Sequence, residues 1–192
     1  MQISWEQRKE IGFVRAFIET NRDILKNPLL FFEALGNSDK RNGAILFASI
    51  ANTLGFCFSF IYMFILKQGG VIAQGKILLI YPLILLFTLI LLHIIAIIMH
   101  SFLSIITSEH HSFEKTLQVL LYIFGASQFF QIIPIFGSFI GTFFLVIFAI
   151  LGLTTVHKVK YYQSITVTVL PFILVSIVFL YVWTLVKDQI QM

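Results

Sequence analysis

The chain has 192 residues, of which 58% are hydrophobic and only 11% are charged, whereas charged residues make up about a quarter of soluble globular domains. This composition excludes an ordinary soluble domain, and the single cysteine, Cys57, excludes an internal disulfide framework. The formal net charge of +4 does not indicate a nucleic-acid partner, because the basic residues lie at the ends of apolar blocks, where membrane orientation explains them.

Residues 1–43 hold the only sizeable polar stretch and predict a cytosolic N-terminal arm of interfacial helices. In the range Trp5–Leu25, apolar residues recur every three or four positions and charged residues occupy the other faces, which predicts one amphipathic helix lying on the membrane. Asn27 and Pro28 then provide a helix start and Gly36 a left-handed stop, so a second, short helix is expected. Because charges recur throughout the arm, no cleavable signal peptide is expected.

Five apolar blocks follow, and they predict an all-α, polytopic membrane domain over residues 44–186. Each block has about 20 residues, and a helix of that length covers the ~30 Å of bilayer hydrocarbon at ~1.5 Å per residue. Residues 187–192 then form a short C-terminal tail. The five predicted spans are approximately 44–66, 77–100, 113–133, 135–156 and 165–186.

Basic residues are distributed unequally between the two sides of this predicted five-span bundle. With the N-terminus in the cytosol, all 13 Lys and Arg residues except Lys67, Lys76 and Lys187 fall in cytosolic segments. This asymmetry predicts an N-terminus in the cytosol and a C-terminus outside, and the expected location is the bacterial inner membrane. The expected partners are the lipid bilayer itself and anionic lipids around the basic N-terminal arm.

The link between the third and fourth blocks is short, uncharged and contains Pro134. It predicts a tight antiparallel hairpin, and the alternative is a re-entrant pair of helices that does not cross the membrane. Small residues at Gly125, Gly137 and Gly141 allow helix backbones to approach closely. They join helices of one chain or of two chains, and we prefer the first interpretation because the third and fourth helices must already pack tightly.

Four histidines near the expected cytosolic ends of the spans are the candidate metal ligands: His100, His110, His111 and His157. Imidazole suits Zn²⁺ and similar metals and also suits proton relay near neutral pH. Their spacing is not a recognised ligand pattern, and ordinary interfacial hydrogen bonding is the competing interpretation. We therefore expect no cofactor, with a bound divalent metal as the alternative.

His93 lies within the second predicted span, where a polar ring needs a partner inside the bundle. We expect one interhelical hydrogen bond, for example to Asn52 of the first span, and the alternative is a polar contact in a pore. The central part of every predicted span lacks Asp, Glu, Lys and Arg, which argues against an ion-coupled pump. No phosphate loop, nucleophile elbow or Cys/His zinc pattern occurs, so the chain is not expected to be an enzyme.

Several motifs together resemble the Yip domain family, the Ypt/Rab-interacting membrane proteins and their bacterial relatives. The motifs are Asn-Pro-Leu-Leu-Phe-Phe at 27–32, His-Ser-Phe-Leu at 100–103, Ser-Phe-Glu-Lys-Thr-Leu-Gln-Val-Leu-Leu-Tyr at 112–122, Ile-Ile-Pro-Ile-Phe-Gly at 132–137 and Leu-Gly-Leu-Thr-Thr-Val-His at 151–157. The resemblance covers about residues 27–186 and implies five spans, a cytosolic N-terminus and membrane scaffolding. The short arm is more similar to the bacterial branch, and no active site is implied.

The expected function is therefore non-enzymatic: the chain organises membrane or partner proteins, with a second membrane protein or another copy of itself as the partner. Deleting residues 1–26 is expected to weaken this association without unfolding the bundle. The alternative is a passive channel or transporter for a metal ion or small solute, lined by His93 and the cytosolic histidines. A membrane enzyme acting on lipid through Glu109, His110 and His111 is a third interpretation.

Overall fold

A computed structural model describes residues 2–38, 43–66, 71–107, 112–134 and 136–171, together with Ile173 and Ile177. Within these ranges every regular element is a helix, which confirms the all-α prediction. A further helix covers residues 161–171. The elements are η1 (Ser4–Gln7), α1 (Arg8–Ile11), α2 (Phe13–Lys26), α3 (Pro28–Gly36), α4 (Gly43–Ile65), α5 (Val71–Thr107), α6 (Phe113–Ser127), η2 (Gln128–Ile132) and α7 (Gly137–His157).

Three of these helices are long and apolar enough to cross a membrane, which indicates an integral membrane protein. They are α4, the part of α5 from Gly75 to Thr107, and α7. They correspond to the predicted spans at 44–66, 77–100 and 135–156. The block at 113–133 is α6 followed by the 3₁₀ helix η2, and the fifth block is described continuously only to residue 171, so the described residues support three of the five predicted spans.

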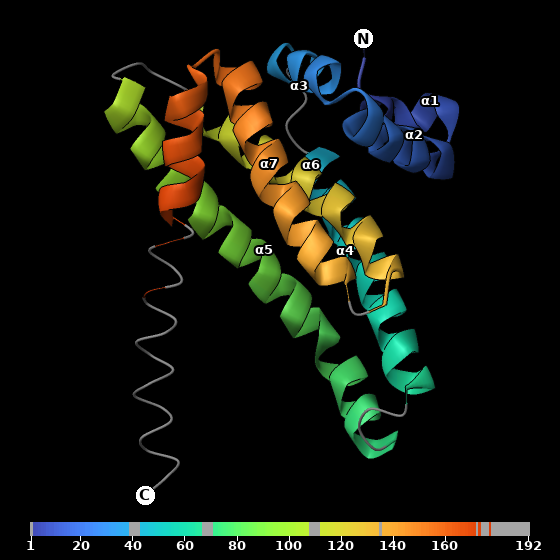
Figure 1. Ribbon diagram of the computed structural model, residues 1–192. Helices are drawn as coiled ribbons and strands as arrows, with labels where there is room; N and C mark the ends of the chain where they lie inside the picture. The colour runs from blue at the N-terminus through green and yellow to red at the C-terminus, as the bar shows by residue number, and fades with distance from the viewer. Residues whose placement is uncertain are drawn as a thin grey trace, which may run out of the picture.

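The helices α4, α5, α6 and α7 run in alternating directions, and the N-terminal helices gather at one end of them (Figure 1). We call this end, which holds η1 to α3 and the start of α6, the cap end. We call the opposite end, where α4 finishes and η2 turns into α7, the distal end.

Helix α6 lies at the centre of the bundle and packs against α4, α5 and α7. Most of its side chains are buried, including the polar residues Thr116, Gln118 and Ser127. Glycines on the neighbouring helices make room for it: a Cβ on Gly152 of α7 would lie 2.6 Å from Val119 Cγ1. Close backbone approach therefore stabilises the centre of the bundle, as expected where small residues face a neighbouring helix.

The N-terminal helices share the hydrophobic core of the bundle. Trp5, Phe31 and Phe32 are each 0% exposed and belong to the same core cluster as Phe47 of α4 and Tyr122 of α6. The arm expected at residues 1–43 is thus an integral part of the fold. An amphipathic pattern specifies that one helix face avoids water, but it does not specify whether protein or lipid covers that face.

Two local predictions for this region are wrong. The single helix expected over Trp5–Leu25 is divided at Gly12, whose φ of +91° is outside the helical region and separates α1 from α2. Gly36 does not form a left-handed stop, because α3 ends with Asn37 at φ −89° in the right-handed region. The C-terminal carbonyls of α3 instead find a partner on α6, described below.

Candidate functional site

The indole of Trp5 anchors the N-terminus to the beginning of α4. Its Nε1 donates a hydrogen bond to the Gly43 carbonyl at 2.6 Å, and its ring makes edge contacts with Phe17 and Phe47 at centroid distances of 6.2 and 5.6 Å. Aromatic pairs at these separations and angles are favourable beyond the area they bury. A residue near the start of the chain therefore fixes the entry of the first membrane helix.

Lys115, at the start of α6, holds the end of α3. Its Nζ donates hydrogen bonds to the Leu35 carbonyl at 2.6 Å and to the Ser38 carbonyl. The Ser38 hydroxyl in turn donates to Glu6 Oε1 at 2.6 Å. A cation at a helix C-terminus satisfies free carbonyls and interacts favourably with the helix dipole. The sequence signal for this contact is a cation at the edge of an apolar block, which by itself indicates only the orientation of the span.

His100 and His157, two of the predicted metal ligands, meet at Thr116 near the cap end. Thr116 Oγ1 lies 3.3 Å from His100 Nδ1 and 3.0 Å from His157 Nε2, so one hydroxyl links α5, α6 and α7. Thr116 is fully buried and His157 is nearly so. A hydroxyl has one proton and two lone pairs, so donating to one ring while accepting from the other couples the tautomers of the two imidazoles.

The other two predicted ligands, His110 and His111, lie outside the described residues together with Glu109. Within the described ranges, no group of three or more His, Cys, Asp or Glu side chains is arranged to hold a metal ion. The four-histidine metal site therefore stays a prediction.

His93 makes a different contact from the one expected. Its Nδ1 lies 2.8 Å from the Leu89 carbonyl of the same helix, four residues back. A carbonyl only accepts, so Nδ1 carries the proton. The interhelical partner predicted for this ring is replaced by a backbone acceptor one turn away, which is always within reach of a helical side chain. Asn52 is half-buried on α4.

The predicted small-residue positions all face their own chain. A Cβ on Gly125 would lie 2.6 Å from the Phe47 ring, one on Gly137 would lie 2.0 Å from the Phe130 carbonyl oxygen, and one on Gly141 would lie 3.1 Å from the Ser127 carbonyl oxygen. Pro134 lies in the tight turn before α7, where its carbonyl accepts a hydrogen bond from the Phe136 amide at 2.7 Å. Contacts within one chain thus account for these positions.

Helix α2 keeps one face away from the protein. Val14 and Ile18 are 68% and 56% exposed, Leu25 is also exposed, and their spacing of four and seven residues places them on one stripe. The basic residues Arg15 and Arg22 lie beside that stripe and are exposed as well. We call these five residues the α2 surface.

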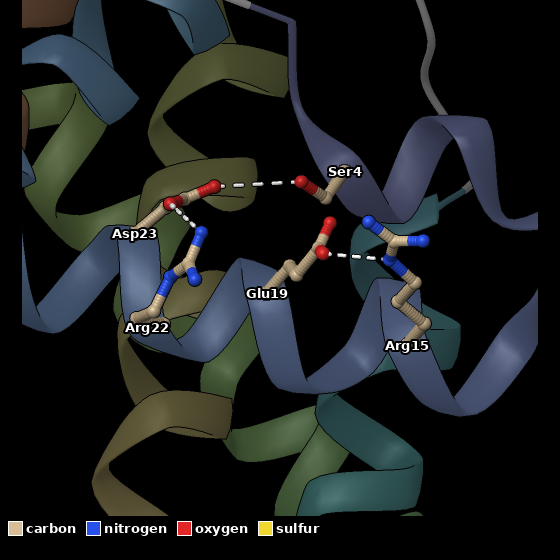
Figure 2. Close-up of polar contacts among 5 residues, drawn as sticks. All are labelled: Ser4, Arg15, Glu19, Arg22 and Asp23. Carbon is tan, nitrogen blue, oxygen red and sulfur yellow. Dashed lines mark hydrogen bonds and ion pairs between the residues drawn. The ribbon is translucent and has the colours of Figure 1, made fainter. Parts of the chain in front are cut away.

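Ion pairs and hydrogen bonds organise the polar side chains around this surface (Figure 2). Arg15 Nε donates to Glu19 Oε1 at 2.8 Å, one turn along the helix. This hydrogen bond raises the pKa of Arg15 and lowers the pKa of Glu19. The nearby pair of Arg22 Nη2 and Asp23 Oδ1 is looser, at 4.0 Å.

Asp23 is a buried carboxyl of α2 that faces Ser4 of η1 (Figure 2). The Ser4 hydroxyl donates to its Oδ2 at 3.4 Å. Burial raises the pKa of Asp23 above its ordinary value, although Arg22 and the Ser4 hydrogen bond oppose this shift. Its charge is therefore a cost to the fold at neutral pH.

Two pockets lie at the distal end, remote from His100 and His157. The larger, of about 280 Å³, lies between the end of α4 and the turn into α7. The smaller, of about 100 Å³, is formed by α4 and η2 and is apolar. The residues that line the larger pocket are Ser59, Tyr62, Met63, Leu66, Gln131, Ile133, Pro134, Gly137 and Ser138.

Comparison of the chain with protein-family models, with curated proteins and with solved structures finds no match. The resemblance to Yip domain proteins therefore depends on the sequence motifs alone.

Proposed function

We propose that the chain is a non-enzymatic membrane scaffold of the Yip type, which organises membrane or partner proteins and rests its cap end on anionic lipid. The α2 surface is the observation that carries this proposal. Apolar side chains that are more than half exposed are unfavourable in water, and guanidinium groups beside them suit a surface of lipid phosphates. Because α2 also packs into the bundle core, lipid bound there would be held in a fixed position relative to the membrane helices.

The proposal includes five membrane passes. Helix α6 has 15 residues and η2 has 5, which correspond to about 22 Å of α-helix and about 10 Å of 3₁₀ helix, together enough for ~30 Å of hydrocarbon. The alternating directions of α4 to α7 and the helix at 161–171 agree with successive passes (Figure 1). The positive-inside asymmetry favours a cytosolic cap end, with a bacterial inner membrane as the proposed location.

The native mass spectrum of the full chain, extracted in a mild detergent, tests both parts of the proposal. We expect retained phosphatidylglycerol and either a stoichiometric membrane-protein subunit or a second copy of the chain. The double variant Arg15→Gln/Arg22→Gln should reduce phosphatidylglycerol retention about thirtyfold, because each basic residue near an anionic surface contributes about 1 kcal/mol. The control is Lys76→Gln, because Lys76 is an exposed cation near the start of α5 and does not belong to the α2 surface. Equal retention in all three proteins would contradict the lipid role, and a bare monomer would contradict the scaffold role.

A passive route for a metal ion or small solute is the second proposal, and the meeting of His100 and His157 at Thr116 is the observation that favours it. If this proposal is correct, the unsubstituted protein should carry a Zn²⁺ flux across the membrane of proteoliposomes, and His100→Ala should abolish that flux. The proposal is contradicted if the unsubstituted protein carries no Zn²⁺ flux, or if the flux persists in His100→Ala.

A further inference from the structure

The larger distal pocket is lined by both polar and apolar side chains. Tyr62 contributes a hydroxyl that donates to the Ile132 carbonyl, and the Ser138 hydroxyl donates to Gln131 Oε1 at 3.2 Å. These two hydrogen bonds give partners to the Ile132 carbonyl and to the Gln131 side-chain oxygen, near the turn between η2 and α7. The lining also includes apolar side chains, among them Met63 of α4 and Leu66.

Two polar groups of this pocket remain available. Among the described residues, no hydrogen bond is made by the Ser59 hydroxyl or by the amide nitrogen of Gln131, whose oxygen is already used by Ser138. An unpaired polar group costs free energy in a low-dielectric environment. The pocket therefore favours an occupant that supplies hydrogen-bond acceptors to Gln131 and a hydroxyl or carbonyl to Ser59.

The position of the pocket restricts what that occupant can be. Helix α4 has 23 residues, or about 34 Å, so its last turn reaches the headgroup region when it crosses ~30 Å of hydrocarbon. Ser59 lies six residues before the last residue of α4, which is about 9 Å inward. The pocket thus extends from the lipid headgroups to the outer part of the acyl chains.

The lack of charge in the described lining indicates the chemical class of the occupant. None of the nine described residues that line it is charged, so the described lining offers no group that pairs with a phosphate. We infer that this pocket binds the neutral glycerol-ester part of a membrane lipid, with an ester carbonyl accepting from the Gln131 amide and a glycerol oxygen at Ser59. The apolar side chains of Met63 and Leu66 then lie against the first methylenes of the acyl chains. This inference does not depend on the scaffold proposal.

Binding of dioctanoylglycerol to the purified full chain, counted by native mass spectrometry, tests the inference. We expect one bound molecule per chain and weaker binding of the diether analogue, which lacks both ester carbonyls. Gln131→Leu, which removes the donor at nearly constant volume, should weaken binding about fivefold to tenfold, as expected for one hydrogen bond. Ser59→Trp, which fills the pocket, should abolish it.

The matched control is Ser49→Trp. Ser49 also lies on α4 but bonds to its own helix and does not line the pocket, so this variant should bind normally. Gln131→Leu keeps the test valid if the larger Ser59 substitution disturbs the contact between α4 and η2. The inference is overturned if the diether binds as well as the diester, or if Gln131→Leu has no effect.

Discussion

The cap end and the distal end of the bundle differ in how their apolar side chains are used. At the cap end, Trp5, Phe31 and Tyr122 are almost completely buried, and hydrogen bonds join residues that are 38 and 80 positions apart. Toward the distal end, α4 and the turn before α7 leave open pockets, and Leu79 of α5 is 81% exposed. The comparison teaches that apolar sequence and protein packing are separate properties of a membrane chain.

Helix α5 illustrates this separation most clearly. Its membrane window has the highest mean hydropathy of the three, 2.8, and also the smallest buried share, 17%, against 28% for α4 and α7. Lipid tails are as apolar as leucine, so side chains such as Leu79 gain nothing further by packing on protein. The most extensive helix packing instead occurs where α6 meets α4 and α7.

Trp5→Ala is the strongest test of the comparison. The substitution removes a fully buried aromatic side chain and the hydrogen bond to Gly43, and we expect the free energy of unfolding to fall by about 3–5 kcal/mol. Thermal unfolding of the protein in detergent, followed by circular dichroism, measures the loss. Leu79→Ala should change stability by less than about 0.5 kcal/mol, and similar losses in both variants would contradict the contrast between the two ends.

Gly137→Ala tests whether any part of the distal end is tightly packed. The added Cβ would lie 2.0 Å from the Phe130 backbone oxygen, which cannot move away as a side chain can, so we expect a loss of about 1–3 kcal/mol. Gly75→Ala is the control, because its Cβ would meet nothing within 4 Å. If both substitutions are neutral in the same unfolding assay, the turn into α7 is more adaptable than its geometry indicates.

Asp23→Asn gives the smallest expected effect and shows it as a pH dependence. Because burial raises the folded-state pKa of Asp23 above its unfolded value, its stabilising contribution is fully present only below the unfolded pKa and is lost as the pH rises through the folded pKa. The variant should therefore be more stable than the unsubstituted protein at pH 7, and its advantage should decline as the pH falls toward 4. A constant difference between the two unfolding midpoints across this range would exclude Asp23 as the source.

Much of the membrane fold was predictable from local signals. The blocks at 44–66 and 135–156 agree closely with α4 and α7. An apolar run of spanning length that is bounded by Gly or Pro strongly favours one membrane helix with ends near those residues. Asn27 and Pro28 likewise predicted the start of α3 at residue 28. By contrast, α5 continues well beyond 77–100, because polar residues outside the hydrocarbon do not interrupt a helix.

The contacts that define the candidate sites were less predictable. His100 and His157 were expected at one depth, but their connection through Thr116 depends on how α6 is rotated between its neighbours. The role of the N-terminal helices depends on tertiary packing in the same way, since the pattern that buries Phe17 in protein also suits burial in lipid. On this structure, deleting residues 1–26 removes part of the core, so we now expect that deletion to destabilise the bundle.

The hydrogen bond from Lys115 to the end of α3 also sets an order of assembly during synthesis. Leu35 emerges 80 residues before its partner, which at about 5–20 residues per second corresponds to roughly 4–16 s of translation. During that interval α3 lacks the cation that satisfies its last carbonyls, and the apolar side chains of the N-terminal helices lack their partners on α6. The contacts of the cap end are therefore complete only after α6 has joined the bundle. Until then, the nascent chain most needs protection from misassociation.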